Sequence, residues 1–301
     1  MNPVNTKPYQ LPPDAVWLIT GCSSGIGRAV ATLIAEQHPS HRLVATARDV
    51  SSLSYLPDNN PNILKLPLDV ASPDSINSAF TAAISHFNHT LDIVVNNAGY
   101  SLSGDTESAT EEETHREIET LFFGTARVAT RSIEVMRQSP DKRGGIIFNI
   151  SSLAGQVGLP GHAYYHAGKF AVEGWSESVA REVHPDWNIN ICIIEPSGVK
   201  TSFEGHSKAH MKPHPAYQSP DMPARKLEAY VQMGIKAGAA AGMLEPGEVA
   251  EAIYSVASKE EKVPLRLPLG PTAWKMIKAK LEAQLRELEE VKGVSAMGRE
   301  L

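Results

Sequence analysis

Short apolar runs alternate along the chain with segments of helical periodicity. The runs contain few polar residues, as strands buried on both faces do, and they cover residues 16–20, 43–47, 63–66, 91–95, 145–150 and 189–194. Between them, apolar residues recur three and four positions apart, which predicts helices over residues 25–37, 73–87, 110–138 and 164–184. Two of these helices have start signals: Ser72 is followed by Pro73, and Thr110 and Glu113 fit a capping box.

This alternation predicts a single α/β domain. Parallel strands joined by crossover helices are covered on both faces, so we expect a Rossmann-type doubly wound parallel sheet with helices on both sides. The catalytic domain should span residues 15–270. A flexible N-terminal segment over residues 1–14 should precede it, and a C-terminal helical extension over residues 271–301 should follow it.

The pattern changes after residue 196. Residues 197–223 are rich in Pro, His, Ser and Lys, which predicts a long loop, and we expect residues 197–245 to form a lid region. Helices are predicted over residues 226–238, 247–258 and 271–291. Residues 263–269 should form an exposed edge strand, because Pro264 and Pro268 cannot donate ladder hydrogen bonds. The apolar stripe from Trp274 to Leu288 indicates a core or dimer contact.

Composition narrows the class of protein. The 301 residues carry 28 basic and 34 acidic side chains, a net charge of −6, which argues against a nucleic-acid-binding protein. There is no uncharged apolar stretch of about 18 residues, so no membrane span is expected. Two cysteines cannot form a disulfide framework, and the first residues do not resemble a signal peptide. A reducing, cytoplasmic location is therefore expected.

A glycine-rich turn of the form Gly-x3-Gly-x-Gly joins the first strand to the first helix. Glycines allow a tight turn and close approach of a pyrophosphate to the helix N-terminus, whose N–H groups attract negative charge. An ordinary tight turn is the alternative. We expect the dinucleotide phosphates to lie against Thr20, Gly21, Ser23, Ser24, Gly25, Ile26 and Gly27.

With three further motifs, the turn resembles the classical short-chain dehydrogenase/reductases. Asn96-Asn97-Ala98-Gly99 after the fourth strand is similar to the second motif of that family. Ser152, Tyr165 and Lys169 match its catalytic Ser and Tyr-x3-Lys pattern, and residues 195–201 resemble its Pro-Gly motif. Within the family, the chain is most similar to the 17β-hydroxysteroid-dehydrogenase-like group.

The chemistry of these residues agrees with that resemblance. Tyr165 and Lys169 stand four apart on one predicted helix, so their side chains share a face. A free phenol has a pKa near 10, and a nearby ammonium together with an oxidised nicotinamide ring should lower it. Tyr165 would then give or take the proton while Ser152 binds the substrate oxygen. The resemblance implies that Lys169 also binds the nicotinamide ribose.

The end of the second predicted strand favours NADP. An acid there would bind the ribose 2′-hydroxyl of NAD, but the chain has Ala47 followed by Arg48, which can pair with a 2′-phosphate. Asp49 comes one position late and is interpreted as a helix-start acid. Asp69 resembles the family residue that meets the adenine amino group. The resemblance implies further cofactor contacts from Val70, Asn97, Ala98, Gly99, Pro196, Gly198, Val199 and Thr201.

One position departs from the family pattern. Many members have Asn in an Asn-x2-Gly segment of the long central helix, where it supports a proton-relay water. This chain has Leu121 at that position and Gly124 three residues later. Leucine neither donates nor accepts a hydrogen bond, so the relay lacks its usual group. Either the helix is reshaped there or solvent supplies the proton.

We therefore expect an NADP-dependent oxidoreductase that acts on a ketone or secondary alcohol of a moderately apolar small molecule. A homodimer or homotetramer is expected. The predicted substrate pocket consists of Tyr100, Leu102, Gly155 and Val157. Two alternatives are a non-catalytic dinucleotide-binding sensor or scaffold, suggested by Leu121, and a pathway-specific non-redox enzyme on the same fold.

His206, His210 and His214 recur every four residues, as metal ligands on a helix could. Prolines interrupt that segment, and no cysteine or carboxylate cluster accompanies it. We therefore expect no metal site.

Overall fold

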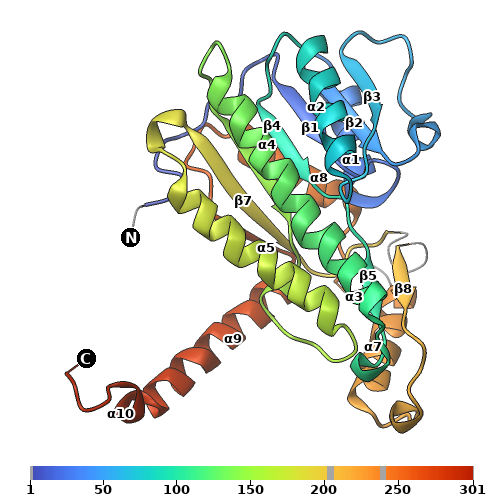
Figure 1. Cartoon of the computed structure of the whole chain (residues 1–301), viewed down its shortest axis with the longest axis vertical. Helices are drawn as coiled ribbons and strands as arrows, with labels where there is room; N and C mark the ends of the chain where they lie inside the picture. The colour runs from blue at the N-terminus through green and yellow to red at the C-terminus, as the bar shows by residue number, and fades with distance from the viewer. Residues whose placement is uncertain (1–2, 202–206, 238–241, 301) are drawn as a thin grey trace.

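The computed structural model describes residues 3–201, 207–237 and 242–300 (Figure 1). Seven parallel strands form one sheet in the order β3-β2-β1-β4-β6-β7-β9. They are β1 (Val16–Ile19), β2 (Arg42–Ala47), β3 (Ile63–Pro67), β4 (Ile93–Asn96), β6 (Gly145–Ile150), β7 (Ile189–Pro196) and β9 (Arg266–Leu269). This is the strand order of a doubly wound Rossmann-type sheet, so the predicted fold class is confirmed, with β9 at the predicted edge.

Helices cover both faces of the sheet. Alternate residues of each strand point to opposite sides, so the apolar strands contribute side chains to a core on each face. Trp17 and Ile19 belong to one hydrophobic core, while Val16 and Leu18 belong to the other. The first core lies under α1 (Gly25–Gln37) and α8 (Pro246–Ser258), and the second under α2 (Pro73–His86), α4 (Thr125–Gln138) and α5 (Ala163–Glu182).

The predicted helix starts are confirmed, but the long central helix is interrupted. The Ser72 side chain caps α2, and Thr110 and Glu113 form the capping box of α3 (Glu111–Ile118). A π-helical turn over Glu119–Gly124 then separates α3 from α4, which corrects the prediction of one regular helix over residues 110–138. The turn brings the backbone of Gly124 against Val70, where a Cβ atom would lie 2.9 Å from the valine side chain.

The sequence predicts a flexible segment over residues 1–14, but within the described residues 3–14 Asn5 and Tyr9 are packed against the domain. Asn5 is buried, and its side-chain amide donates to the carbonyls of Ile191 and Val263 at 2.8 and 3.0 Å. Its side-chain oxygen accepts a hydrogen bond from the Ile191 N–H at 3.1 Å. Tyr9 is also buried in the first core. Residues 3–14 therefore belong to the domain, because one amide satisfies backbone groups of two chain segments.

The lid region carries more structure than the predicted loop over residues 197–223. Strand β8 (Lys208–His210) pairs in parallel with β5 (Ser101–Ser103) as a separate two-stranded sheet, and α7 (Pro223–Ala237) follows. The buried Asp105 carboxylate accepts two hydrogen bonds from Arg225 on α7, at 2.6 and 2.7 Å, and one from the His214 N–H at 3.0 Å. Asp105 thus holds the lid against the body of the domain.

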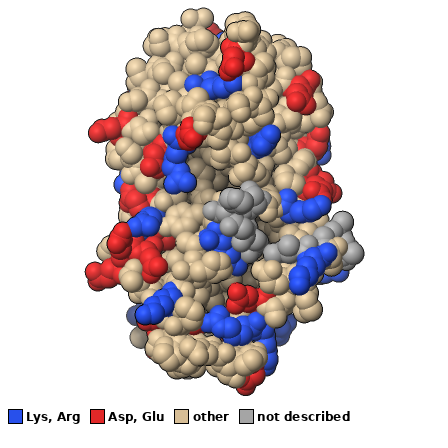
Figure 2. All heavy atoms as spheres, turned by 90° about the vertical axis from the view of Figure 1, so that its right-hand side faces the viewer, with Lys and Arg blue, Asp and Glu red and all other residues tan. Residues whose placement is uncertain are grey.

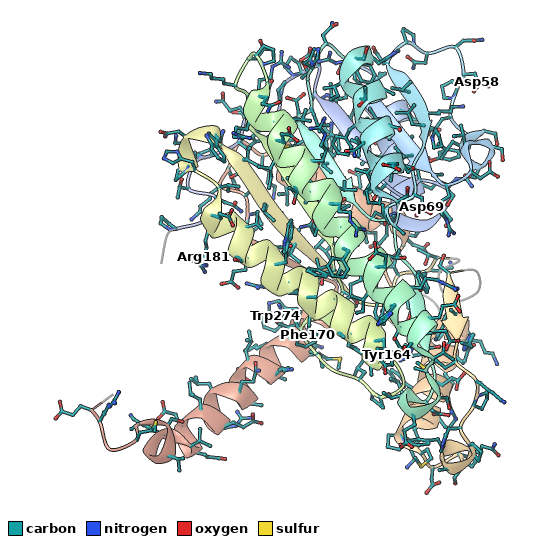
Figure 3. All side chains as sticks on the ribbon, in the orientation of Figure 1. Asp58, Asp69, Tyr164, Phe170, Arg181 and Trp274 are labelled. Atoms are coloured by element: carbon teal, nitrogen blue, oxygen red, sulfur yellow. The ribbon has the colours of Figure 1, made fainter. Side chains whose placement is uncertain are left out.

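The C-terminal helix α9 (Pro271–Glu290) leaves the domain and ends in the short α10 (Lys292–Ser295) (Figure 1). Its first turns pack on the domain through Ala273 and Ile277, and Figure 3 labels Trp274 on the same part of the helix. Within the predicted apolar stripe, Ile277 is buried, whereas Trp274, Leu281, Leu285 and Leu288 are more than half exposed and are not core in the single chain. None of the described helices combines the length and apolar character needed to cross a bilayer.

Breaking the ion pair of the lid tests this arrangement. Arg225→Met should leave the Asp105 carboxylate buried without its cation, which costs about 3–5 kcal/mol for a buried pair. Hydrogen–deuterium exchange of α7 and of residues 207–217 should accelerate, while exchange in the large sheet stays slow. Lys226→Met removes the exposed neighbouring cation and is the control. Equal exchange of α7 in the two variants would contradict the role of Asp105.

Candidate active site

The candidate site lies where the carboxyl ends of the parallel strands meet, and the glycine-rich turn follows β1 there. Gly21 and Gly25 have left-handed backbone conformations, with φ of +71° and +59°. Gly27 has no room for a side chain, because a Cβ atom would lie 2.4 Å from the Gly21 carbonyl oxygen. Backbone conformation therefore favours glycine at positions 21 and 25, and lack of space requires it at position 27.

Thr20 and Asn97 hold this turn against the end of β4. The Thr20 hydroxyl accepts hydrogen bonds from the N–H groups of Asn97 and Ala98, both at 3.0 Å. The Asn97 side-chain amide donates to the carbonyls of Thr20 and Gly21 at 3.0 and 3.1 Å. The polar groups of both side chains, predicted to bind cofactor, therefore serve to fix the shape of the turn.

The N-terminus of α1 suits an anion. Ser24 is the N-cap residue, but its side chain makes no capping hydrogen bond, and the first turn contains no acidic residue. Thr201 lies over the turn, since a Cβ atom on Gly25 would be 3.3 Å from the threonine methyl group. Uncapped N–H groups at a helix start bind phosphate well, so this turn fits the pyrophosphate of a dinucleotide.

An open groove of about 860 Å³ starts at the turn and runs between α1 and α8. Its lining includes Ser24, Gly25, Arg28, Lys200 and Thr201. Figure 2 shows the side of the molecule toward which the strands point, hollowed in the middle, with basic and acidic side chains around the hollow.

The chain directly after β2 carries a cation, Arg48, and an acid, Asp49, whose carboxylate is already hydrogen-bonded within the chain. Arg48 is exposed directly after the strand, whereas Ala47 is buried. Asp49 is the N-cap of a short 3-10 helix, as the sequence predicted. Its carboxylate accepts hydrogen bonds from the N–H and the hydroxyl of Ser51 at 2.9 and 2.8 Å, which hold the pKa of Asp49 below its usual range.

Asp69 is exposed two residues after β3, at the edge of the sheet (Figure 3). One of its carboxylate oxygens accepts a hydrogen bond from the Ala71 N–H at 3.0 Å. Val70 is buried. The acid is therefore held in a fixed turn at the surface, where the sequence placed an adenine contact.

Ser152 lies at the start of the loop after β6, and that loop packs on α5, the helix that carries Tyr165 and Lys169. Lys169 is buried, and its ammonium donates to the carbonyl of Ile150, the last residue of β6, at 2.7 Å. The same ammonium lies 5.8 Å from the centre of the Tyr165 ring. The hydroxyl of Ser152 accepts a hydrogen bond from the Ala154 N–H at 3.1 Å. The helical spacing of four thus places a cation beside the phenol.

Glu117 on α3 is a buried acid near Lys169 that was not identified from the sequence. One of its carboxylate oxygens accepts a hydrogen bond from the Leu102 N–H at 3.0 Å. Burial raises the pKa of Glu117 to about 7, and burial lowers the pKa of Lys169 to about 8. The useful signal was spacing: Glu117 stands four residues before Leu121, hence on the same helical face.

Leu121 fills the space between two glycines beside the site. It is 1% exposed, and Cβ atoms on Gly99 and Gly168 would lie 2.8 and 3.0 Å from its methyl carbons. Gly168 directly precedes Lys169 in the chain. Position 121 is therefore adjacent to the site and apolar, and the helix is reshaped there by the π turn.

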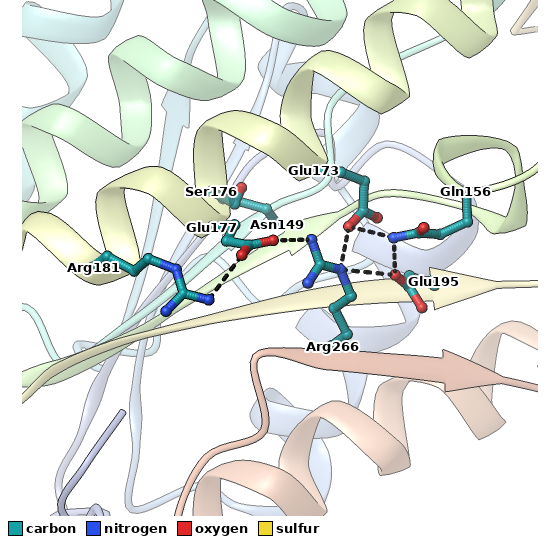
Figure 4. Close-up of polar contacts among 8 residues, drawn as sticks. All are labelled: Asn149, Gln156, Glu173, Ser176, Glu177, Arg181, Glu195 and Arg266. Atoms are coloured by element: carbon teal, nitrogen blue, oxygen red, sulfur yellow. Dashed lines mark hydrogen bonds and ion pairs between the residues drawn. The ribbon is translucent and has the colours of Figure 1, made fainter. Parts of the chain in front are cut away.

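A buried charge network lies behind the loop that follows β6 (Figure 4). Gln156 donates to both Glu173 and Glu195, at 3.1 and 3.0 Å. Arg266 on β9 donates to Glu173 at 3.0 Å and lies 3.7 Å from Glu195. Burial and the neighbouring Glu173 raise the pKa of Glu195 to about 8. Two buried carboxyl groups therefore share one nearby guanidinium, and Gln156 bridges them.

The four residues predicted to form the substrate pocket lie in different surroundings, and the pocket itself stays a prediction. Tyr100 is half-buried and Leu102 is fully buried. Gly155 faces the interior, since a Cβ atom there would lie 2.3 Å from the Ser151 hydroxyl. Val157 packs on the small cluster beneath α9. Gly155 and Val157, in the loop that follows β6, thus both pack against neighbouring side chains.

The histidines after β7 make local contacts. His210 lies 3.2 Å from the Ser103 hydroxyl, and His214 caps a short 3-10 helix. His206 is outside the described residues. Across the described ranges, no group of three or more His, Cys, Asp or Glu side chains is arranged to hold a metal ion.

Comparison with known proteins agrees with this geometry. Residues 15–212 match the family model described as short chain dehydrogenase. The chain is 64% identical over 299 residues to oxidoreductase calM of Penicillium decumbens, covering 99% of this chain and 97% of that protein. It is 38% identical over 186 residues to a 3-ketodihydrosphingosine reductase of Bacteroides thetaiotaomicron, covering 62% and 64% of the two chains. A solved short-chain dehydrogenase from Streptomyces avermitilis superposes with a TM-score of 0.80 and 32% identity, covering 94% of this chain and 97% of that one.

The steric role of Gly27 can be measured with a pair of glycine variants. Gly27→Ala forces a methyl group against the Gly21 carbonyl, and overpacking of this kind should lower the free energy of unfolding by about 1–3 kcal/mol. Gly174→Ala on α5, where nothing lies within 4 Å of the added atom, should raise it by about 0.5–1 kcal/mol through helix propensity. Thermal or urea unfolding compares the two. Equal stability of both variants would show that the turn can relax around position 27.

Proposed function

The chain belongs to the short-chain dehydrogenase family, and we propose that it is an NADP-dependent oxidoreductase acting on ketones or secondary alcohols. The observation that carries the proposal is the Lys169 ammonium, held by the Ile150 carbonyl at 2.7 Å and placed beside the Tyr165 ring. The relative from Bacteroides thetaiotaomicron, a reductase of a 3-keto compound by its name, supports a ketone as substrate. The substrate is a moderately apolar small molecule.

The side chains of the site divide the work of proton transfer. Bound NADP supplies or accepts the hydride. Ser152 donates a hydrogen bond to the substrate oxygen and so orients the carbonyl. Tyr165 gives its phenolic proton to that oxygen during reduction and takes it back during oxidation. The ammonium of Lys169 stabilises the phenolate form of Tyr165 by its charge.

Three residues at the end of β2 support NADP over NAD. Ala47 offers no carboxylate for a ribose 2′-hydroxyl, and the carboxylate of Asp49 is occupied by Ser51. Arg48 is exposed and can form charged hydrogen bonds with a 2′-phosphate. Phosphate binding at the uncapped start of α1 completes the proposed cofactor site.

Cofactor choice is tested at position 48. Arg48→Ala should weaken NADPH binding by about 1.5–3 kcal/mol, the contribution of hydrogen bonds to a charged group, and leave NADH binding nearly unchanged. Ala47→Asp should shift the preference toward NADH. Fluorescence titration with both cofactors measures the dissociation constants, and Arg299→Ala, remote in the C-terminal tail, is the control. An equal loss for both cofactors in Arg48→Ala would refute the 2′-phosphate contact.

The proton donor is tested with adjacent tyrosines. Tyr165→Phe should keep NADPH binding but reduce turnover of a ketone by about 10²–10⁴, the usual contribution of a positioned acid. Tyr164→Phe removes the neighbouring hydroxyl and should leave turnover unchanged. NADPH oxidation is followed across a panel of aromatic and alicyclic ketones. If the wild type binds NADPH but reduces none of them, the non-catalytic dinucleotide-binding alternative gains support.

A further inference from the structure

A buried carboxyl group lies on the helix that packs against the helix of the proton-transfer residues. Glu117 is 0% exposed, and one of its oxygens accepts the hydrogen bond from the Leu102 N–H at 3.0 Å. Its other oxygen is buried as well, and the Tyr100 side chain is a polar group that interacts with this carboxyl group and lowers its pKa. Burying an acid costs free energy, so the presence of Glu117 here needs an explanation in the chemistry of the site.

Glu117 and Lys169 lie on two helices, α3 and α5, that pack against each other. Burial lowers the pKa of Lys169, and the charges of Glu117 and Glu173 oppose that effect. The Lys169 ammonium has three N–H donors, and the structure gives one of them to the Ile150 carbonyl.

The side chain of Leu121 blocks a hydrogen-bonded path for protons to Lys169 past position 121. Its side chain fills the space between Gly99 and Gly168, one helical turn after Glu117. No hydrogen bond can pass through that side chain. The polar group that this helical face offers near Lys169 is therefore the one at position 117.

We propose that Glu117 is a positioning residue that holds the proton with which Lys169 recharges Tyr165, in place of a polar group at position 121. This inference rests on the proposed function, because it concerns the proton consumed in ketone reduction.

Every proton that is transferred in this sequence has a donor and an acceptor. In reduction, hydride from NADPH forms the new C–H bond, and the Tyr165 O–H bond breaks as the substrate oxygen takes the proton. The phenolate regains a proton at the expense of the Lys169 ammonium, and the resulting amine regains one from the Glu117 carboxylic acid. Solvent then returns a proton to the Glu117 carboxylate, and oxidation of an alcohol runs the sequence in reverse.

The acidities of the two groups suit such an exchange. Burial brings the pKa values of Glu117 and Lys169 to about 7 and about 8, whereas their ordinary values are 4.5 and 10.5. A proton therefore moves between them at low cost near neutral pH. The other titratable groups facing the pair are Tyr100 on the Glu117 side and Tyr165 and Glu173 on the Lys169 side.

Three variants separate proton supply from structure. Glu117→Gln keeps an oxygen for the Leu102 N–H but cannot titrate, and Glu117→Asp keeps the acid. Glu112→Gln changes an exposed acid of the same helix and is the control. NMR titration of isotope-labelled lysine and glutamate side chains in the cofactor-free protein measures the pKa of Lys169 without relying on turnover.

In Glu117→Gln, the pKa of Lys169 should fall by about one pH unit or more, because an opposite charge has been removed. Turnover of the best ketone of the panel at neutral pH should fall about tenfold, the equivalent of one pH unit. In the wild type, turnover in reduction should decline as pH rises through about 7, where Glu117 loses its proton, and this step should vanish in Glu117→Gln. Glu117→Asp should recover most of both effects.

An unchanged Lys169 pKa and pH profile in Glu117→Gln would overturn the proposal, even if turnover fell. Equal losses in Glu117→Gln and Glu117→Asp would overturn it as well, since both would then report lost packing. These outcomes are distinct from failure of the proposed function, which Tyr165→Phe tests separately.

Discussion

One hydrogen bond, from the Lys169 ammonium to the Ile150 carbonyl, ties helix α5 to the carboxyl end of β6. Ser152 stands two residues beyond that carbonyl, and Tyr165 stands one helical turn before the lysine. Fixing the ammonium therefore fixes both other groups, since the strand and the helix are rigid. The bond also compensates part of the cost of burying a cation, which is large when the cation has no partner.

Burial of charge is the second constraint on the site. Three acids lie in the interior: Glu117 on the helix packed against that of Lys169, and Glu173 and Glu195 beside the guanidinium of Arg266. Burial raises the pKa of each acid, so the interior carries less negative charge than a count of its carboxyl groups suggests. The site thus keeps ionisable groups that change protonation near neutral pH, where acid–base chemistry needs them.

Sequence patterns predicted the large sheet because its strands are apolar runs bounded by turn residues, a local signal. They also predicted the glycine turn and the pairing of Tyr165 with Lys169, which depend on fixed short spacings. They could not predict strands β5 and β8, whose three residues each show no alternation and whose partners are distant in the chain. The same holds for Asn5 and Glu117, single polar residues that became buried through contacts made only in the folded protein.

The hydrogen bonds that hold the lid region against the domain have a consequence for the order of folding. Ser103 and His210 are 107 positions apart, and Asp105 and Arg225 are 120 positions apart. Closing such long loops costs entropy that only a formed framework repays, so we expect the lid to dock late, on a sheet already assembled. Contacts formed late can also be released without unfolding the remainder. The same few hydrogen bonds would then form last during folding, and they would also be the ones that break when the lid region detaches from the mature protein.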